Sequence, residues 1–76
     1  MTKEITKKKR ILHVDDEKDT LEVVRTILEK EGFEVVSISN AGQALKEVDL
    51  NNFNLLILDI MMPDMMHLNY RWRQHG

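Results

Sequence analysis

The sequence predicts an α/β fold in which three strands form one parallel sheet. Two short apolar runs, residues 10–14 and 53–58, each end in carboxylates, at Asp15 and at Asp59, as strands buried on both faces of a parallel sheet do. Two segments with helical periodicity and one β-branched segment lie between them, so strands and helices alternate. Two successive strand-helix crossovers predict a right-handed βαβαβ unit.

The first strand is expected at residues 10–14 (Arg-Ile-Leu-His-Val), with His13 as a buried, hydrogen-bonded core residue rather than a ligand. An amphipathic helix is expected over residues 17–31, because apolar residues recur there at helical spacing, at Leu21, Val24, Ile27 and Leu28. Acidic residues in its first turn, Lys30 in its last, and Gly32 as a left-handed residue after it mark both ends.

The second strand is expected at residues 34–39, a β-branched and half-alternating segment typical of a strand near a sheet edge. Asn40 is a good N-cap for a short helix over residues 41–50, whose apolar face holds Ala44, Leu45 and Val48. The third strand, residues 53–58, is the most apolar in the chain.

Length and composition limit the possible classes of protein. The 76 residues suffice for one small domain, and the absence of cysteine excludes a disulfide-stapled fold. The longest apolar run in the middle, residues 55–58, is far too short to cross a bilayer, and no apolar segment follows the basic start as in a signal peptide. We therefore expect a cytoplasmic protein without membrane contact.

Charge is unevenly distributed along the chain. The formal net charge is −2, but residues 1–10 hold five basic residues and one acid, a net +4, whereas residues 11–66 hold four basic and twelve acidic residues, a net −8. An acidic body argues against nucleic acid as the main ligand, because phosphate contacts need a cationic surface. It favours a cation or a basic partner.

Three carboxylates follow two of the predicted strands. Asp15 and Asp16 come after the first strand and Asp59 after the third, and ligands of parallel sheets bind at the carboxyl ends of strands. Asp15 or Asp16 alone is explained as well by an N-cap or a solvated loop as by a ligand role. Three together repel one another unless a cation lies among them, and Mg²⁺ suits such an oxygen site.

A dinucleotide-binding unit needs a glycine-rich turn where this chain has Asp-Asp-Glu, so that class is excluded.

Two motifs together resemble the receiver domain of two-component response regulators. They are Ile-Leu-His-Val-Asp-Asp-Glu at residues 11–17 and Leu-Leu-Ile-Leu-Asp-Ile-Met-Met-Pro-Asp-Met at residues 55–65, and the resemblance covers roughly residues 9–64. It implies the N-terminal half of a flavodoxin-like fold with strand order 2-1-3. It also implies that Asp59 accepts a phosphoryl group from a histidine kinase or phosphotransfer protein. The implied Mg²⁺ ligands are Asp16 directly, Asp15 through water, Asp59 and the backbone carbonyl of Met61.

The resemblance ends after Met65. The family's Asp-Gly pair is replaced by Met66-His67, and the 17 residues after Asp59 (76 − 59) match neither the fourth and fifth strands nor the family's Ser/Thr, Lys and switch aromatic. We therefore expect a basic extension at residues 1–8, a partial receiver domain at 9–65, and a divergent tail or helix remnant at 66–76.

The expected function is a phosphorelay signalling module that uses Mg²⁺ and is not an enzyme. The alternative is a degenerate or truncated fragment that acts only through protein association, without a working phospho-switch. An apolar third strand at a sheet edge predicts self-association, because its outer ladder side is unpaired. Helix 17–31 is expected to lose part of its packing surface.

Overall fold

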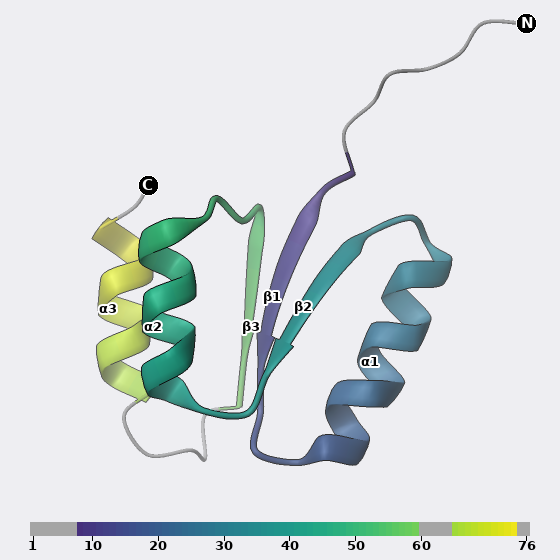
Figure 1. Ribbon diagram of the computed structural model, residues 1–76, viewed down its shortest axis with the longest axis horizontal. Helices are drawn as coiled ribbons and strands as arrows, with labels where there is room; N and C mark the ends of the chain where they lie inside the picture. The colour runs from purple at the N-terminus through teal and green to yellow at the C-terminus, as the bar shows by residue number, and fades with distance from the viewer. Residues whose placement is uncertain (1–7, 60–64, 75–76) are drawn as a thin grey trace, which may run out of the picture.

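The computed structural model describes residues 8–59 and 65–74. Its strands β1 (Arg10–Val14), β2 (Glu34–Ile38) and β3 (Leu55–Leu58) form a parallel sheet in the order β2-β1-β3. Helix α1 (Lys18–Lys30) covers one face, and α2 (Ala41–Leu50) and α3 (Met65–Gln74) cover the other (Figure 1). The predicted α/β fold, with its strand order, is confirmed.

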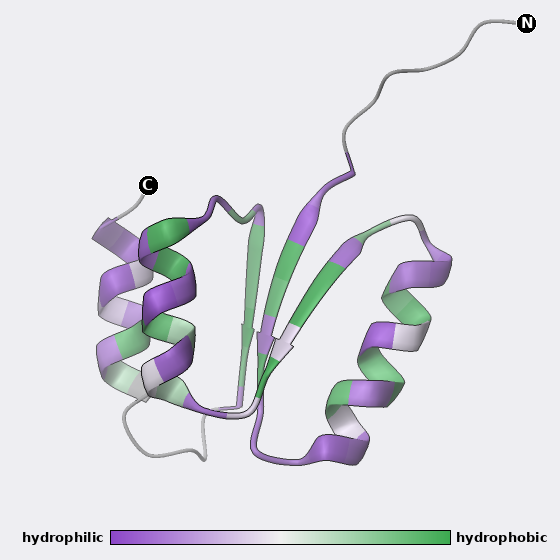
Figure 2. Cartoon of the chain, viewed as in Figure 1, coloured by the Kyte–Doolittle hydropathy of each residue, from purple (hydrophilic) through white to green (hydrophobic). Residues whose placement is uncertain are grey.

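The central strand β1 sets the register of the sheet. Leu12 pairs with Val36 of β2 and Leu56 of β3, and Val14 pairs with Ile38 and Leu58. These alternate residues face α2 and α3, where they form the core with the buried residues Ala41, Ala44, Val48 and Leu68. In Figure 2, apolar residues are shown in green along the strands and on the sides of the helices that face the sheet.

Two strands differ slightly from their predicted bounds. β2 ends at Ile38 rather than residue 39, and β3 begins at Leu55 rather than residue 53. At the start of β3, the N–H of Asn54 donates to the carbonyl of Arg10 (2.7 Å), but the N–H of Arg10 donates to Asn54 Oδ1 (2.8 Å). The Asn54 side chain thus takes the place of a backbone acceptor for the Arg10 N–H. Regular pairing of β1 with β3 therefore begins one residue after Asn54, at Leu55.

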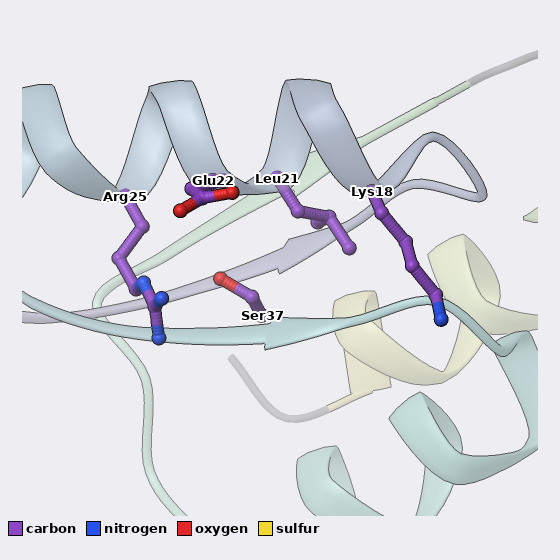
Figure 3. A pocket seen from close by; sticks show the side chains of 5 residues that line it. All are labelled: Lys18, Leu21, Glu22, Arg25 and Ser37. Atoms are coloured by element: carbon purple, nitrogen blue, oxygen red, sulfur yellow. The ribbon is translucent and has the colours of Figure 1, made fainter.

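Helix α1 starts at Lys18 and packs mainly on the edge strand β2. Leu21 is its buried residue, lying over the strand near Ser37 (Figure 3), and Gly32 has the expected left-handed φ of 94°. Ile27, which lies on the predicted apolar stripe of this helix, is 55% exposed. Because α1 packs mainly on the edge strand β2, part of its apolar stripe stays exposed, which agrees with the expected loss of packing surface.

Helices α2 and α3 lie side by side on the other face (Figure 1). Asn40 caps α2 as predicted, its side chain accepting from the N–H of Gln43 at 2.9 Å. Leu68 of α3 is fully buried, and Arg71 of α3 forms an exposed ion pair with Asp49 of α2 at 2.6 Å. The C-terminal segment, expected as a tail or helix remnant, is therefore a packed helix.

Strand β3 is an edge strand, as the sequence predicted. No strand among the described residues pairs with its outer side, and Leu55 is 50% exposed.

In the part of the chain that the structure describes, no helix is long and apolar enough to span a membrane.

Candidate functional site

The carboxyl ends of β1 and β3 bring acidic residues to one edge of the sheet. The N–H of Asp59 donates to the carbonyl of Val14 (3.0 Å), which extends the β1–β3 ladder by one residue. The N–H of Asp15 donates to the carbonyl of Ile38 (3.1 Å) and extends the ladder on the other side. The backbone positions of both aspartates are therefore fixed by the sheet.

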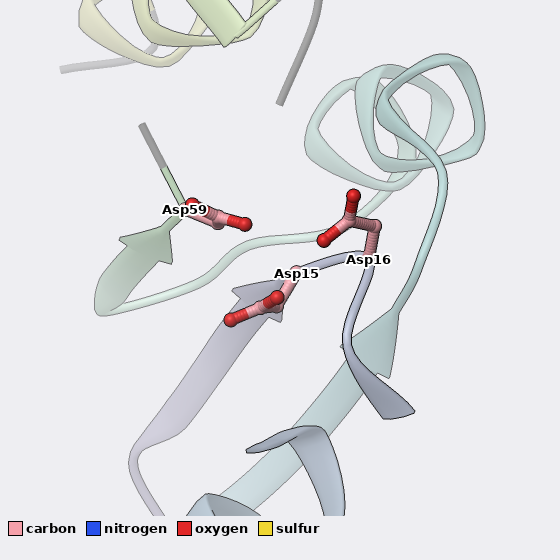
Figure 4. Close-up of side chains that lie close together, drawn as sticks. All are labelled: Asp15, Asp16 and Asp59. Carbon is pink, nitrogen blue, oxygen red and sulfur yellow. The ribbon is translucent and has the colours of Figure 1, made fainter. Parts of the chain in front are cut away.

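Three carboxylates meet at this edge. One oxygen from each of Asp15, Asp16 and Asp59 lies within 4.8 Å of the others, and Figure 4 shows Asp16 and Asp59 turned toward each other beside the end of β1. The predicted convergence is thus observed. Among the described residues no other group of three acids, histidines or cysteines could hold a metal.

The spacing of these oxygens fits Mg²⁺. Two oxygens bound to one octahedral Mg²⁺ lie at most about 4.2 Å apart, twice the metal–oxygen distance of about 2.1 Å. A separation of 4.8 Å is therefore suitable if one carboxylate binds through water. The roles of Asp15, Asp16 and Asp59 stay predictions, and the carbonyl of Met61 lies outside the described residues.

Asp15 is held by contacts to both of its carboxylate oxygens. Oδ1 accepts from the N–H of Glu17 at 2.9 Å, where the chain turns into α1, and Oδ2 lies 3.9 Å from Nε2 of His13. The Asp15 side chain is only 13% exposed. Such a fixed carboxylate needs little reorganisation to bind a cation.

His13 is the neighbour that sequence reasoning placed only in the core. It is 2% exposed, as predicted, but its Nδ1 has no hydrogen-bond partner among the described residues, so the predicted hydrogen bonding is not found there. Its approach to Asp15 follows from the strand, because residues two apart point to the same face. The spacing of two residues between His13 and Asp15 was therefore the sequence signal that could have predicted this contact.

His13 makes stability depend on pH. Burial lowers the pKa of its imidazole, against the opposing effect of the Asp15 and Asp59 carboxylates. In the unfolded state the imidazole pKa is about 6.5, so just below that pH the unfolded state binds more protons than the folded state. We expect the free energy of unfolding to fall as pH decreases through this window, by at most about 1.4 kcal/mol per pH unit.

Urea denaturation of the metal-free protein on either side of the ordinary imidazole pKa measures this dependence. His13→Leu should remove it, whereas substitution of the exposed His67 by Gln should leave it unchanged. An equal pH dependence in the chain and in His13→Leu would contradict the prediction.

Comparison with known proteins identifies the family to which the chain belongs. A family model described as the response regulator receiver domain matches residues 11–70, which include β1 apart from its first residue, β2, β3, α1, α2 and all three aspartates. The chain belongs to this receiver domain family. The sequence resemblance is therefore confirmed, and receiver domains are modules of two-component signalling.

Relatives carry the receiver sequence in larger proteins. The chain is 36% identical over 55 residues to the alkaline phosphatase synthesis transcriptional regulatory protein PhoP of Bacillus subtilis, and 44% identical over 56 residues to the probable transcriptional regulator ycf27 of Cyanophora paradoxa. These matches cover 72% and 74% of this chain and 23% of each relative. A third match, at 36% identity over 56 residues, covers 8% of the CAI-1 autoinducer sensor kinase/phosphatase CqsS of Vibrio cholerae and 74% of this chain. The receiver chain thus spans about a quarter of the two regulators.

Proposed function

We propose that this receiver domain accepts a phosphoryl group on Asp59 from a histidine kinase or phosphotransfer protein, with Mg²⁺ bound at the acidic edge. The observation that carries the proposal is the convergence of three carboxylates from two strand ends within 4.8 Å in a chain of this family. Asp16 would ligate the metal directly and Asp15 through water. Asp59 and the backbone carbonyl of Met61 would complete the protein ligands.

The reaction requires Asp59 to act as a nucleophile. One of its carboxylate oxygens attacks the phosphorus of the donor phosphohistidine, forming an O–P bond as the P–N bond breaks. The imidazole of the donor keeps the electron pair of the broken bond and takes up a proton. The ladder bond of Asp59 fixes its backbone at the edge, and the two contacts of Asp15 orient that carboxylate. Bound Mg²⁺ supplies positive charge that offsets the charge on the phosphoryl oxygens.

The complete carboxylate cluster supports this function over that of a fragment acting only by association. An association fragment has no need to concentrate three like charges at one edge, because their repulsion destabilises the fold. We therefore propose a signalling module whose product is its own phosphorylated side chain, rather than an enzyme with turnover on a separate substrate. A cytoplasmic location stays a prediction.

Mg²⁺ binding tests the site without any phosphoryl donor. Asp16→Asn should weaken Mg²⁺ binding about tenfold or more, because loss of a direct carboxylate ligand removes a full negative charge from a small site. Calorimetric or NMR titration with Mg²⁺ measures the change. The control is Asp19→Asn, which removes the same charge from an exposed position in the first turn of α1. Equal affinities for Asp16→Asn and Asp19→Asn would refute the assignment.

Self-association through β3 is a further expectation. No strand among the described residues pairs with the outer side of the apolar strand Leu55–Leu58, and a lysine on such an edge discourages pairing. Size-exclusion chromatography with light scattering should show a mass above that of the monomer at micromolar concentration, and Leu55→Lys should restore the monomer. Met66→Lys, at an 85% exposed position on α3, is the control. A compact, stable monomer of the unaltered chain would count decisively against association.

A further inference from the structure

A basic hollow lies at the end of the sheet opposite the acidic edge. It has a volume of about 550 Å³ and is lined by residues from the start of β1, the end of α2 and the loop between α2 and β3. These three segments lie at the top of the molecule in Figure 1. Its lining includes Lys8, Lys9, Arg10, Leu50, Asn52 and Asn54, and no acid among the described residues lines it. This end of the molecule has no part in the proposed phosphoryl transfer.

The backbone around the hollow is fixed on both sides of β1. The N–H of Glu34 donates to the carbonyl of Lys9 (2.9 Å), and the N–H of Asn54 donates to the carbonyl of Arg10 (2.7 Å). The Arg10 N–H donates to Asn54 Oδ1 at 2.8 Å, which orients the Asn54 amide. The amide nitrogen of Asn54 is therefore left as a donor beside the hollow.

Arg10 forms a fixed wall of the hollow. Its Nε lies 3.3 Å from Glu34 Oε2, its Nη1 donates to the carbonyl of Asn52 at 3.3 Å, and its guanidinium lies 4.9 Å from the centre of the Phe53 ring. Much of its charge is thus already compensated by Glu34.

Lys8 and Lys9 supply the charge that is not compensated. Neither forms an ion pair with any described residue, and both are exposed. Two exposed lysines alone would be an ordinary solvated surface. Here they line one hollow with the side-chain amides of Asn52 and Asn54, and no carboxylate from the described part of the chain lines it.

We propose that this hollow binds a phosphate group. Lysine ammonium groups bind phosphate as point charges, and amide N–H groups donate to its remaining oxygens. Leu50, which is 77% exposed at the rim, offers apolar contact to whatever carries the phosphate. The site explains why the basic start of the chain is anchored against the asparagine-rich loop, and it is independent of phosphorylation at Asp59.

NMR titration of the metal-free full chain with inorganic phosphate, against chloride at equal ionic strength, tests the site. We expect saturable shifts of the backbone amides of Lys9, Arg10 and Asn54. Asn54→Asp keeps the acceptor for the Arg10 N–H but replaces the donor by a negative charge, so binding should weaken about tenfold or more. The control is Asn69→Asp, which adds the same charge at an exposed position on α3 and should change binding less than about twofold.

Paired lysine variants separate a local site from general attraction. Lys8→Gln with Lys9→Gln should weaken binding about fivefold or more, whereas Lys30→Gln with Lys46→Gln removes equal charge from exposed positions elsewhere and should have little effect. Absence of saturable shifts, or equal weakening by both pairs, would overturn the proposal. A nucleoside monophosphate distinguishes the source: tighter binding than inorganic phosphate assigns the site to phosphomonoesters, and equal binding assigns it to free phosphate.

Discussion

Asp59→Asn is expected to abolish phosphorylation of the chain. Incubation of the unaltered protein with Mg²⁺ and acetyl phosphate, or with a phosphorylated histidine kinase, should add one phosphoryl group that is stable in acid and labile in base. An amide in place of the carboxylate is a poor nucleophile and carries no charge to bind the metal, so the variant should show no labelling. Intact-mass spectrometry before and after base treatment measures the modification.

The matched control for this experiment is Asp19→Asn. Asp19 is an exposed acid in the first turn of α1 and does not belong to the carboxylate cluster. Labelling of Asp19→Asn should equal that of the unaltered chain, and omission of Mg²⁺ should strongly reduce both. Retained labelling in Asp59→Asn, or no labelling of a folded, unaltered protein, would remove the basis for the proposed function.

Leu68→Ala is expected to cause the largest loss of stability in the C-terminal helix. The Leu68 side chain is 0% exposed and belongs to the core formed with β1 and α2. Truncating a buried leucine costs about 2–5 kcal/mol, because apolar contacts are lost and a cavity remains. A small domain has a total stability of about 5–15 kcal/mol, so this change should remove a large fraction of the free energy of unfolding.

Met66→Ala provides the comparison within the same helix. Its side chain is 85% exposed, and such surface changes usually alter stability by less than about 0.5 kcal/mol. Urea denaturation followed by circular dichroism measures both variants. Equal effects of the two substitutions would show that α3 does not pack as described and that the core ends at α2.

Local sequence signals were sufficient for most element bounds. β1 and α2 have the predicted bounds, and α1 lacks only one predicted residue at each end. Asn40 and Gly32 mark boundaries through hydrogen bonding and backbone preferences within a few residues. Such features are predictable because both partners lie in the same short stretch of sequence.

The position of the acidic edge was also determined by sequence. Carboxylates directly after two apolar runs reach the same edge in any parallel sheet that pairs those strands. The spacing within 4.8 Å, however, depends on the ladder bonds at Asp15 and Asp59, which join residues far apart in the chain. The contact of Asp15 with His13 likewise needed the burial that only packing provides.

The tertiary structure alone decided those features that depend on contacts between residues far apart in the sequence. The start of β3 is set by the Asn54 side chain, which accepts from the N–H of Arg10, 44 residues away, and the exposure of Ile27 follows from the packing of α1 mainly on the edge strand β2. The burial of Leu68 depends on α3 lying against α2. The sequence by itself determined the order of elements and the chemistry at the strand ends, because these depend on local periodicity and residue type. Which surfaces are covered depends on long-range packing, which no local pattern encodes.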